Sequence, residues 1–180
     1  MASTKNAYVL PFRRKDLIKA RADPRAHFGH LKHAIDFILP EGSTLLAAKE
    51  GEVVDIKVDS NKGGPDIRYA GNKYLNYMTI QHSNGELSQY AHLKYKGALV
   101  KMGAKVKTGQ PIAISGNTGL STNPHLHFHI LKLNKTPIGW ETLKIKFKER
   151  LKIDRKAYPI PKEMKKFAKD LEKMKKKLIT

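Results

Sequence analysis

Residues 124–130 constrain the fold of this chain most, because polar and apolar residues alternate strictly there and every polar residue after Pro124 is a histidine. Alternation with a period of two is typical of a half-buried β-strand, whose successive side chains point to opposite faces. The three histidines, His125, His127 and His129, should therefore share one face. Neighbouring imidazoles on a strand lie about 7 Å apart, so one could bind a divalent metal ion while another moves a proton. A polar sheet face that happens to use histidine is the alternative.

The absence of cysteine limits the kinds of metal site that the chain can build. With no cysteine among 180 residues, disulfides and thiolate metal sites are excluded, and a zinc site needs histidines and carboxylates. The length predicts one domain, alone or with an appendage, around a single core. The first fifteen residues lack the apolar segment of a secretion signal, and no run is long enough for a membrane span. We therefore expect neither feature in the sequence as given.

A second candidate ligand, Asp36, lies upstream of the histidine strand. Alternating apolar residues over 35–39 predict a strand, and Asp36 stands inside it. A carboxylate in an apolar strand is costly unless it is paired or bound to a metal ion. We interpret Asp36 as a metal ligand, with a hydrogen-bonded structural acid as the alternative. Three histidines precede it, namely His27, His30 and His33.

Most of the chain before its basic C-terminal part predicts short strands. A hairpin of strands 75–81 and 87–93 is expected around Asn84-Gly85, a strong signal for a tight turn, and it ends near His92. Glycines punctuate residues 100–119, which is typical of tight turns between brief strands. The chain is therefore expected to be mainly β.

The C-terminal part differs in composition from the rest. Residues 144–180 hold 15 lysines and arginines against 5 acids, a net charge of +10 out of +19 for the chain. Apolar residues recur at steps of three or four from Met164 to Leu178, which predicts a basic amphipathic helix. The helix packs on the domain with its lysines in water, or lies on an anionic cell-wall polymer or membrane surface. We expect an N-terminal extension (1–26), a domain (27–143) and a basic C-terminal extension.

Several further motifs stand in the order found in one known family. The chain resembles the M23 zinc metallopeptidases of the lysostaphin and LytM type, whose pattern is a His followed by an Asp, a Tyr-x-His and a His-x-His. The resemblance covers roughly residues 27–131. The stretches that carry it are Ala34-Ile35-Asp36-Phe37, Pro40-Glu41-Gly42-Ser43, Gln89-Tyr90-Ala91-His92-Leu93, Val100-Lys101-Met102-Gly103, Gly109-Gln110, Ser115-Gly116-Asn117-Thr118-Gly119 and Pro124-His125-Leu126-His127-Phe128.

The resemblance implies roles for four residues and a LytM-type antiparallel sheet, a barrel-sandwich core. Asp36 and His127 would be zinc ligands, and His92 and His125 would be the two catalytic histidines that do not bind the metal. Zinc, one ion per chain, would lower the pKa of a water molecule to roughly 7 and polarise the scissile carbonyl. One of the two catalytic histidines would act as general base, and the other would stabilise the oxyanion or protonate the leaving amine. Which histidine does which stays open.

The third zinc ligand is less directly indicated. In the simplest family pattern it stands four residues before the aspartate, where this chain has Lys32. In other members it stands about nine residues upstream, followed by x-Gly, and His27-Phe28-Gly29 fits that version. We therefore prefer His27, with His30 second and His33 third. His129 occupies a position where an acidic residue is common, and we interpret it as a bystander.

The resemblance implies a zinc-dependent endopeptidase that cleaves peptidoglycan cross-bridges or stem peptides and acts at the cell wall. A non-catalytic LytM-like binding or regulatory module is the alternative, although all the required residue types are present. Nucleic acid is not an expected partner, because the basic part has few aromatic residues and no recognised module. We expect the protein to be a monomer.

Overall fold

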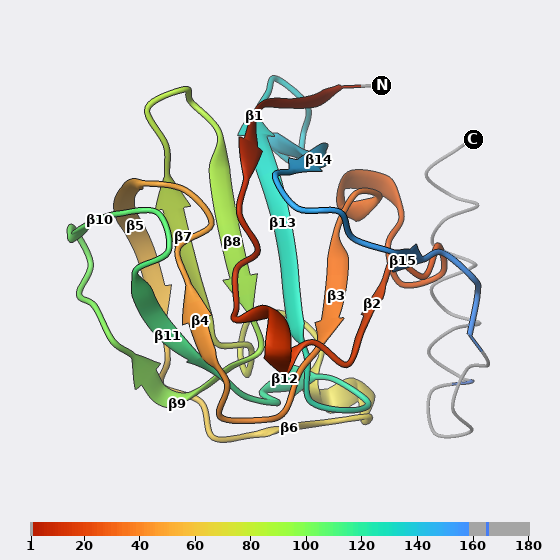
Figure 1. Ribbon diagram of the computed structural model, residues 1–180. Coiled ribbons are helices and arrows are strands. Elements are labelled where there is room, and N and C mark those ends of the chain that lie inside the picture. The colour runs from red at the N-terminus through yellow and green to blue at the C-terminus, as the bar shows by residue number, and fades with distance from the viewer. Residues whose placement is uncertain (1, 159–164, 166–180) are drawn as a thin grey trace.

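A large, mostly antiparallel sheet forms the framework of the protein, seen in a computed structural model that describes residues 2–158 and 165 (Figure 1). The sheet branches at an interior strand, β13 (Leu126–Leu133): β14 (Trp140–Phe147) pairs with the end of β13 and, in parallel, with β1 (Ser3–Tyr8). Along the main path the strands are β10 (Lys105–Val106), β5 (Gly51–Lys57), β7 (Tyr77–Gln81), β8 (Leu87–Ala91), β13 (Leu126–Leu133), β3 (Ile35–Ile38), β2 (Lys19–Arg21) and β15 (Ile153–Asp154).

A smaller sheet covers one face of the large one and closes the core. It contains β4 (Thr44–Leu46), β11 (Pro111–Ser115) and β9 (Leu93–Ala98), and lies in front of the large sheet in Figure 1. Side chains from both sheets, such as Phe128 and Ile112, are fully buried in a single hydrophobic cluster. This packing explains why a chain so rich in lysine folds around one core.

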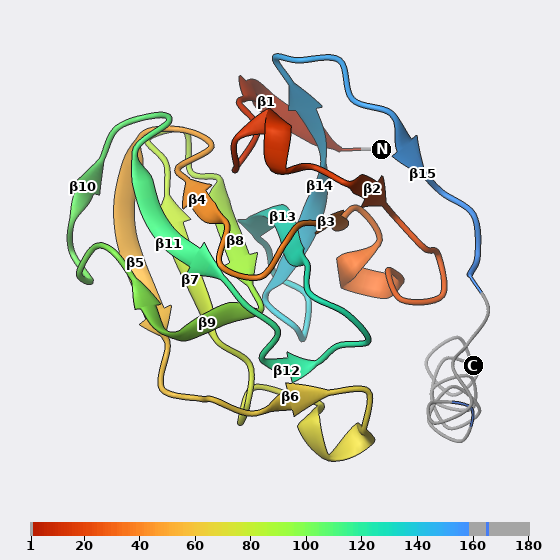
Figure 2. The same cartoon turned by 60° about the horizontal axis from the view of Figure 1, so that its bottom comes forward.

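The remaining elements are short. A parallel ladder of β6 (Gly63–Gly64) and β12 (Gly119–Leu120) lies at the lower end of the molecule in Figure 1 and comes forward in Figure 2. The described residues also form the single-turn 3-10 helices η1 (Arg14–Asp16), η2 (Gly29–Leu31) and η3 (Ile67–Tyr69). In the part of the chain that the structure describes, no helix has the length and apolar character needed to cross a membrane.

The central strand β13 has the alternation that its sequence predicts. Leu126, Phe128 and Ile130 are fully buried in the core. The opposite face carries the histidines, and His127 stands opposite Asp36 of β3 in the antiparallel register. Directly opposed residues of paired strands project from the same face. The strand pairing therefore brings Asp36 and His127 together on the face that points away from the core.

The predicted mainly β fold of the LytM type is confirmed, including the hairpin of β7 and β8, whose arms pair from Gln81 and Leu87 outward. The expected C-terminal helix over Met164 to Leu178 lies outside the described residues, apart from residue 165. The division at residues 26 and 143 stays a prediction. In the structure, strands from both flanking segments join the large sheet.

Candidate metal centre

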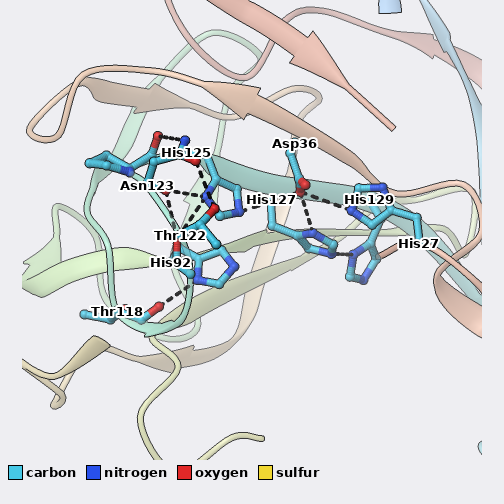
Figure 3. Close-up of polar contacts among 11 residues, drawn as sticks. His27, Asp36, His92, Thr118, Thr122, Asn123, His125, His127 and His129 are labelled. Atoms are coloured by element: carbon cyan, nitrogen blue, oxygen red, sulfur yellow. Dashed lines mark hydrogen bonds and ion pairs between the residues drawn. The ribbon is translucent and has the colours of Figure 1, made fainter. Parts of the chain in front are cut away.

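Three side chains from separate segments place their donor atoms around one point on the histidine face. Figure 3 shows His27, Asp36 and His127 turned toward each other. Asp36 Oδ1 lies 2.9 Å from His127 Nδ1 and 3.2 Å from His27 Nε2. The donor atoms of all three residues lie within 4.8 Å of one another. These are the three residues that the family resemblance implies as zinc ligands, with His27 as the preferred third member.

A tight turn before η2 delivers His27 to this point. The backbone NH of His27 donates to the carbonyl oxygen of Asp23 at 2.8 Å, and the Asp23 side chain accepts from the NH of Arg25. His27 is buried, with 5% of its surface exposed, and its Nδ1 has no hydrogen-bond partner among the described residues. The turn therefore places the His27 side chain beside Asp36, with its second ring nitrogen, Nε2, facing the carboxylate.

The donor set fits a zinc ion. Tetrahedral zinc with ligands near 2.0–2.1 Å needs donor atoms about 3.3 Å apart. The two measured edges, 2.9 Å from Asp36 to His127 and 3.2 Å from Asp36 to His27, are close to that value. Two imidazole nitrogens and one carboxylate oxygen would leave a fourth position open, as catalytic zinc sites do.

The protonation states of Asp36 and His127 suit a cation. Burial opposes ionisation of Asp36, but the surrounding rings of His125, His127 and His27 hold the pKa of its carboxyl group well below the usual range. Burial lowers the pKa of His127, against the effect of its hydrogen bond with Asp36. An ionised carboxylate and a neutral imidazole are the forms that bind metal ions.

Two more histidines stand beside the three donors with their Nε2 atoms available. His92 Nδ1 lies 2.6 Å from the carbonyl oxygen of Thr118, and His125 Nδ1 lies 2.8 Å from that of Asn123 (Figure 3). A carbonyl oxygen only accepts, so each Nδ1 carries the hydrogen and each neutral ring has a bare Nε2. The two rings are 4.4 Å apart, and His125 Nε2 lies 3.7 Å from Asp36 Oδ1.

The side chain of His92 reaches the site because its backbone is left-handed. Its neighbour Ala91 stands opposite His127, so simple alternation would turn His92 toward the core. Instead, His92 has φ of +63° at the break between β8 and β9, a conformation that few residues other than glycine adopt. Burial, followed by the nearby His125 and His127, lowers the pKa of His92 to about 3, so the ring is neutral at pH 7.

The loop groups that orient these two histidines were not found from the sequence. Thr118 and Asn123 act through backbone carbonyls, which every residue has, so no side-chain pattern marks them. The Thr118 side chain is itself held, since its hydroxyl donates to the Leu93 carbonyl at 2.8 Å and accepts from the NH of Asn76. These hydrogen bonds hold Thr118, and with it the carbonyl that orients His92, against the backbone of Leu93 and Asn76.

The remaining histidines of the sequence prediction lie outside the donor set. The His30 ring packs against the edge of Trp140, with ring centres 4.6 Å apart, and His33 is half-buried near the basic residues Lys32 and Lys144. His129, interpreted from the sequence as a bystander, is buried beside His127. Its ring is 1% exposed, with Nδ1 3.4 Å from His127 Nε2. Burial lowers its pKa well below the usual value.

The fold and this arrangement agree with what the chain is similar to. Residues 30–139 match peptidase family M23, so the chain belongs to that family. The match begins just after His27. Two similar solved structures are a zinc containing peptidase from Vibrio cholerae, with a TM-score of 0.51, and lysostaphin from Staphylococcus simulans, with a TM-score of 0.50. Each is 29% identical over 69% of this chain, which covers 36% and 46% of those chains respectively.

Similar sequences point to the same family. A metalloprotease of Buchnera aphidicola, named as uncharacterised, is 35% identical over 139 residues, which are 74% of this chain and 33% of that protein. The peptidoglycan DD-endopeptidase ShyA of Vibrio cholerae is 41% identical over 96 residues, 53% of this chain and 19% of that protein. The chain thus spans between a fifth and a third of the length of these relatives.

Proposed function

We propose that this protein is a zinc-dependent endopeptidase that hydrolyses peptide bonds in peptidoglycan. The observation that carries the proposal is the convergence of His27, Asp36 and His127 within 4.8 Å, with the bare nitrogens of His92 and His125 beside them. Zinc bound by the three donors would supply a Lewis acid that polarises the scissile carbonyl and lowers the pKa of a water molecule to roughly 7.

The chain's own residues would handle the protons of the reaction. A carbonyl oxygen behind each ring occupies Nδ1 of His92 and of His125, so Nε2 is the nitrogen left to exchange a proton, and His125 Nε2 lies 3.7 Å from Asp36 Oδ1. One ring can accept a proton from the attacking water as general base, and its conjugate acid can return a proton to the leaving amine. The other, with its own proton, can stabilise negative charge on the carbonyl oxygen. The division between the two rings stays open.

The choice of substrate rests on family membership and on relatives. ShyA is named as a peptidoglycan DD-endopeptidase, and one solved relative is described as zinc containing. The net charge of +19 would favour contact with an anionic cell wall. We therefore infer that a single chain with one zinc ion acts on cell-wall peptides, and that its basic C-terminal part contacts anionic wall polymer or membrane. The non-catalytic module is the competing hypothesis.

Hydrolysis tests the reaction directly. Zinc-loaded protein incubated with purified, cross-linked peptidoglycan should release peptide-cleaved fragments that mass spectrometry identifies. Treatment with a chelator should stop release, and added zinc should restore it. His127→Ala should be inactive, whereas His33→Ala, which alters a histidine outside the donor set, should keep near wild-type activity. A zinc-loaded wild type that cleaves no peptide bond would favour the non-catalytic module.

Zinc analysis tests the ligand set separately. The wild type should bind one zinc ion per chain, and His27→Ala should bind markedly less. His30→Ala is the matched control, because His30 lies three residues further along and contacts Trp140 instead of Asp36. If His30→Ala loses zinc while His27→Ala keeps it, the assignment of the third ligand is wrong.

A further inference from the structure

His129 is held in a fixed orientation directly behind the proposed ligand His127. Its ring lies flat against the indole of Trp140, with ring planes 2° apart and centres 5.6 Å apart. Its exposure is 1%, and its Nδ1 lies 3.4 Å from Nε2 of His127. Figure 3 shows the two rings joined by this contact on the side away from His92 and His125. His129 thus touches a ligand without being one of the three donors.

The two nitrogens of His127 face different partners. Nδ1 lies beside Asp36, where the cation would bind, and Nε2 lies beside His129. A neutral imidazole that gives its Nδ1 lone pair to a metal ion must carry its hydrogen on Nε2. That hydrogen would point at the Nδ1 lone pair of His129. Among the described residues, no partner is found for the other nitrogen of His129, Nε2.

We infer that His129 is a positioning residue for the metal site, acting through His127. It accepts the hydrogen on His127 Nε2 and so holds the ligand ring in the orientation and tautomer that present Nδ1 to the cation. Trp140 keeps the acceptor in place. Such partners behind a metal-binding histidine typically change metal affinity by about 10–100-fold when they are removed. The inference rests on the proposed zinc site, and its test must separate the two.

Two substitutions distinguish a hydrogen-bond acceptor from a residue that only fills space. His129→Leu places an apolar side chain of similar bulk against Trp140 and removes the hydrogen-bond acceptor. His129→Asn keeps an oxygen near the position of Nδ1 but leaves a gap in the packing. If the role is acceptance, asparagine preserves zinc affinity better than leucine. If the role is packing alone, the order is reversed.

The measurement is zinc affinity by competition with a chelator of known affinity, beside the stability of the metal-free proteins in denaturant. We expect His129→Leu to weaken zinc binding by about 10–100-fold while its metal-free stability equals or exceeds that of the wild type. We expect His129→Asn to bind zinc more tightly than His129→Leu although it is the less stable of the two.

Each outcome decides the matter. Wild-type affinity in His129→Leu, or an asparagine variant that binds no better than the leucine variant, would overturn the positioning role while leaving the zinc site intact. Asp36→Ala, which removes a proposed ligand, should bind no zinc and serves as the reference for lost binding. If the wild type also binds no zinc, both the proposed function and the positioning role are wrong.

Discussion

Two buried polar clusters in this protein contain histidine, and they differ in how completely their polar atoms are paired within the chain. The closed cluster consists of Tyr8, His82 and Glu86 with their partners. Glu86 accepts from the Tyr8 hydroxyl at 2.7 Å and from the backbone NH of Lys5 at 2.6 Å. Both ring nitrogens of His82 are also paired, with the Glu50 carbonyl and the Ser88 hydroxyl.

The open cluster consists of His27, Asp36, His92, His125, His127 and His129. Three of its rings approach the same oxygen, Asp36 Oδ1, at 2.9–3.7 Å. Two of its buried nitrogens, on His27 and His129, lack partners among the described residues. Buried polar groups in folded proteins are nearly always paired, and exceptions mark functional sites or missing ions. The comparison predicts that the closed cluster stabilises the fold and that the open cluster binds an ion.

The largest expected effect is the loss of zinc and activity in Asp36→Ala. Removing the carboxylate takes away the donor that touches both other ligands, so we expect hydrolysis to fall by at least about 1,000-fold, as for the loss of other principal transition-state contacts. Zinc binding should fall with it, while circular dichroism should show an intact β fold. Asp55→Ala is the matched control, since Asp55 is an exposed aspartate of β5, and β7 and β8 separate that strand from β13 in the sheet. If Asp36→Ala still binds zinc, the conclusion that the open cluster binds the ion is wrong.

Glu86→Ala should have the opposite effect: it should lower the stability of the fold and leave zinc binding unchanged. The change leaves the Tyr8 hydroxyl and the NH of Lys5 without their acceptor, and the Tyr8 pKa, which burial and Glu86 raise, shows that the hydroxyl stays protonated as a donor. We expect a loss of about 3 kcal/mol in the free energy of unfolding, measured by denaturant titration. Zinc affinity of the folded protein should stay at the wild-type value. Glu52→Ala, at an exposed glutamate, should leave both quantities unchanged.

Acid should destabilise the metal-free protein through both clusters. Burial lowers the pKa of His82 and of His92, the latter to about 3, whereas an unfolded histidine titrates near about 6.5. Between these two pH values the unfolded chain binds more protons than the folded chain. The contribution of these histidines to the free energy of unfolding is therefore fully present above a pH of about 6.5 and decreases as the pH falls toward 3. We expect a loss of about 1–2 kcal/mol between pH 7 and pH 5.

Denaturant titrations at both pH values, with a chelator present, measure this loss. His82→Leu should reduce the pH dependence of unfolding without touching the metal site, and His92→Leu should reduce it further. Equal stability of the wild type at pH 7 and pH 5 would show that these rings are not held neutral by burial.

The contrast between the clusters also shows which parts of the site a sequence can predict. Period-two alternation gives the two faces of β13, and the acid in an apolar strand marks Asp36, because strand geometry fixes side-chain direction. The same rule fails for His92, whose positive φ turns the ring out of the direction that alternation gives it. It also says nothing of the turn at Asp23 that delivers His27, or of the pairing of β3 beside β13 across about 90 residues.

Other parts of the site depend on contacts that leave no local signal. The carbonyl oxygens of Thr118 and Asn123 orient the rings of His92 and His125 through backbone atoms alone. The contact of His129 with His127 follows from the strand, but its rigidity comes from Trp140 on the next strand. Family resemblance supplied the roles of His92 and His125, and their geometry became visible only in the folded chain.

The smallest expected effect comes from Ser121→Ala, which tests how firmly the open cluster is held. The Ser121 hydroxyl lies 3.2 Å from His125 Nδ1, but the Asn123 carbonyl is nearer at 2.8 Å and fixes the same hydrogen. Because the carbonyl remains, we expect zinc affinity to be unchanged and hydrolysis to fall by less than about five-fold, a loss within about 1 kcal/mol for one neutral hydrogen bond. Ser83→Ala, the same change at an exposed serine in the turn between β7 and β8, is the control. A fall of 100-fold in hydrolysis, with zinc still bound, would mean that the Ser121 hydroxyl and not the Asn123 carbonyl orients His125.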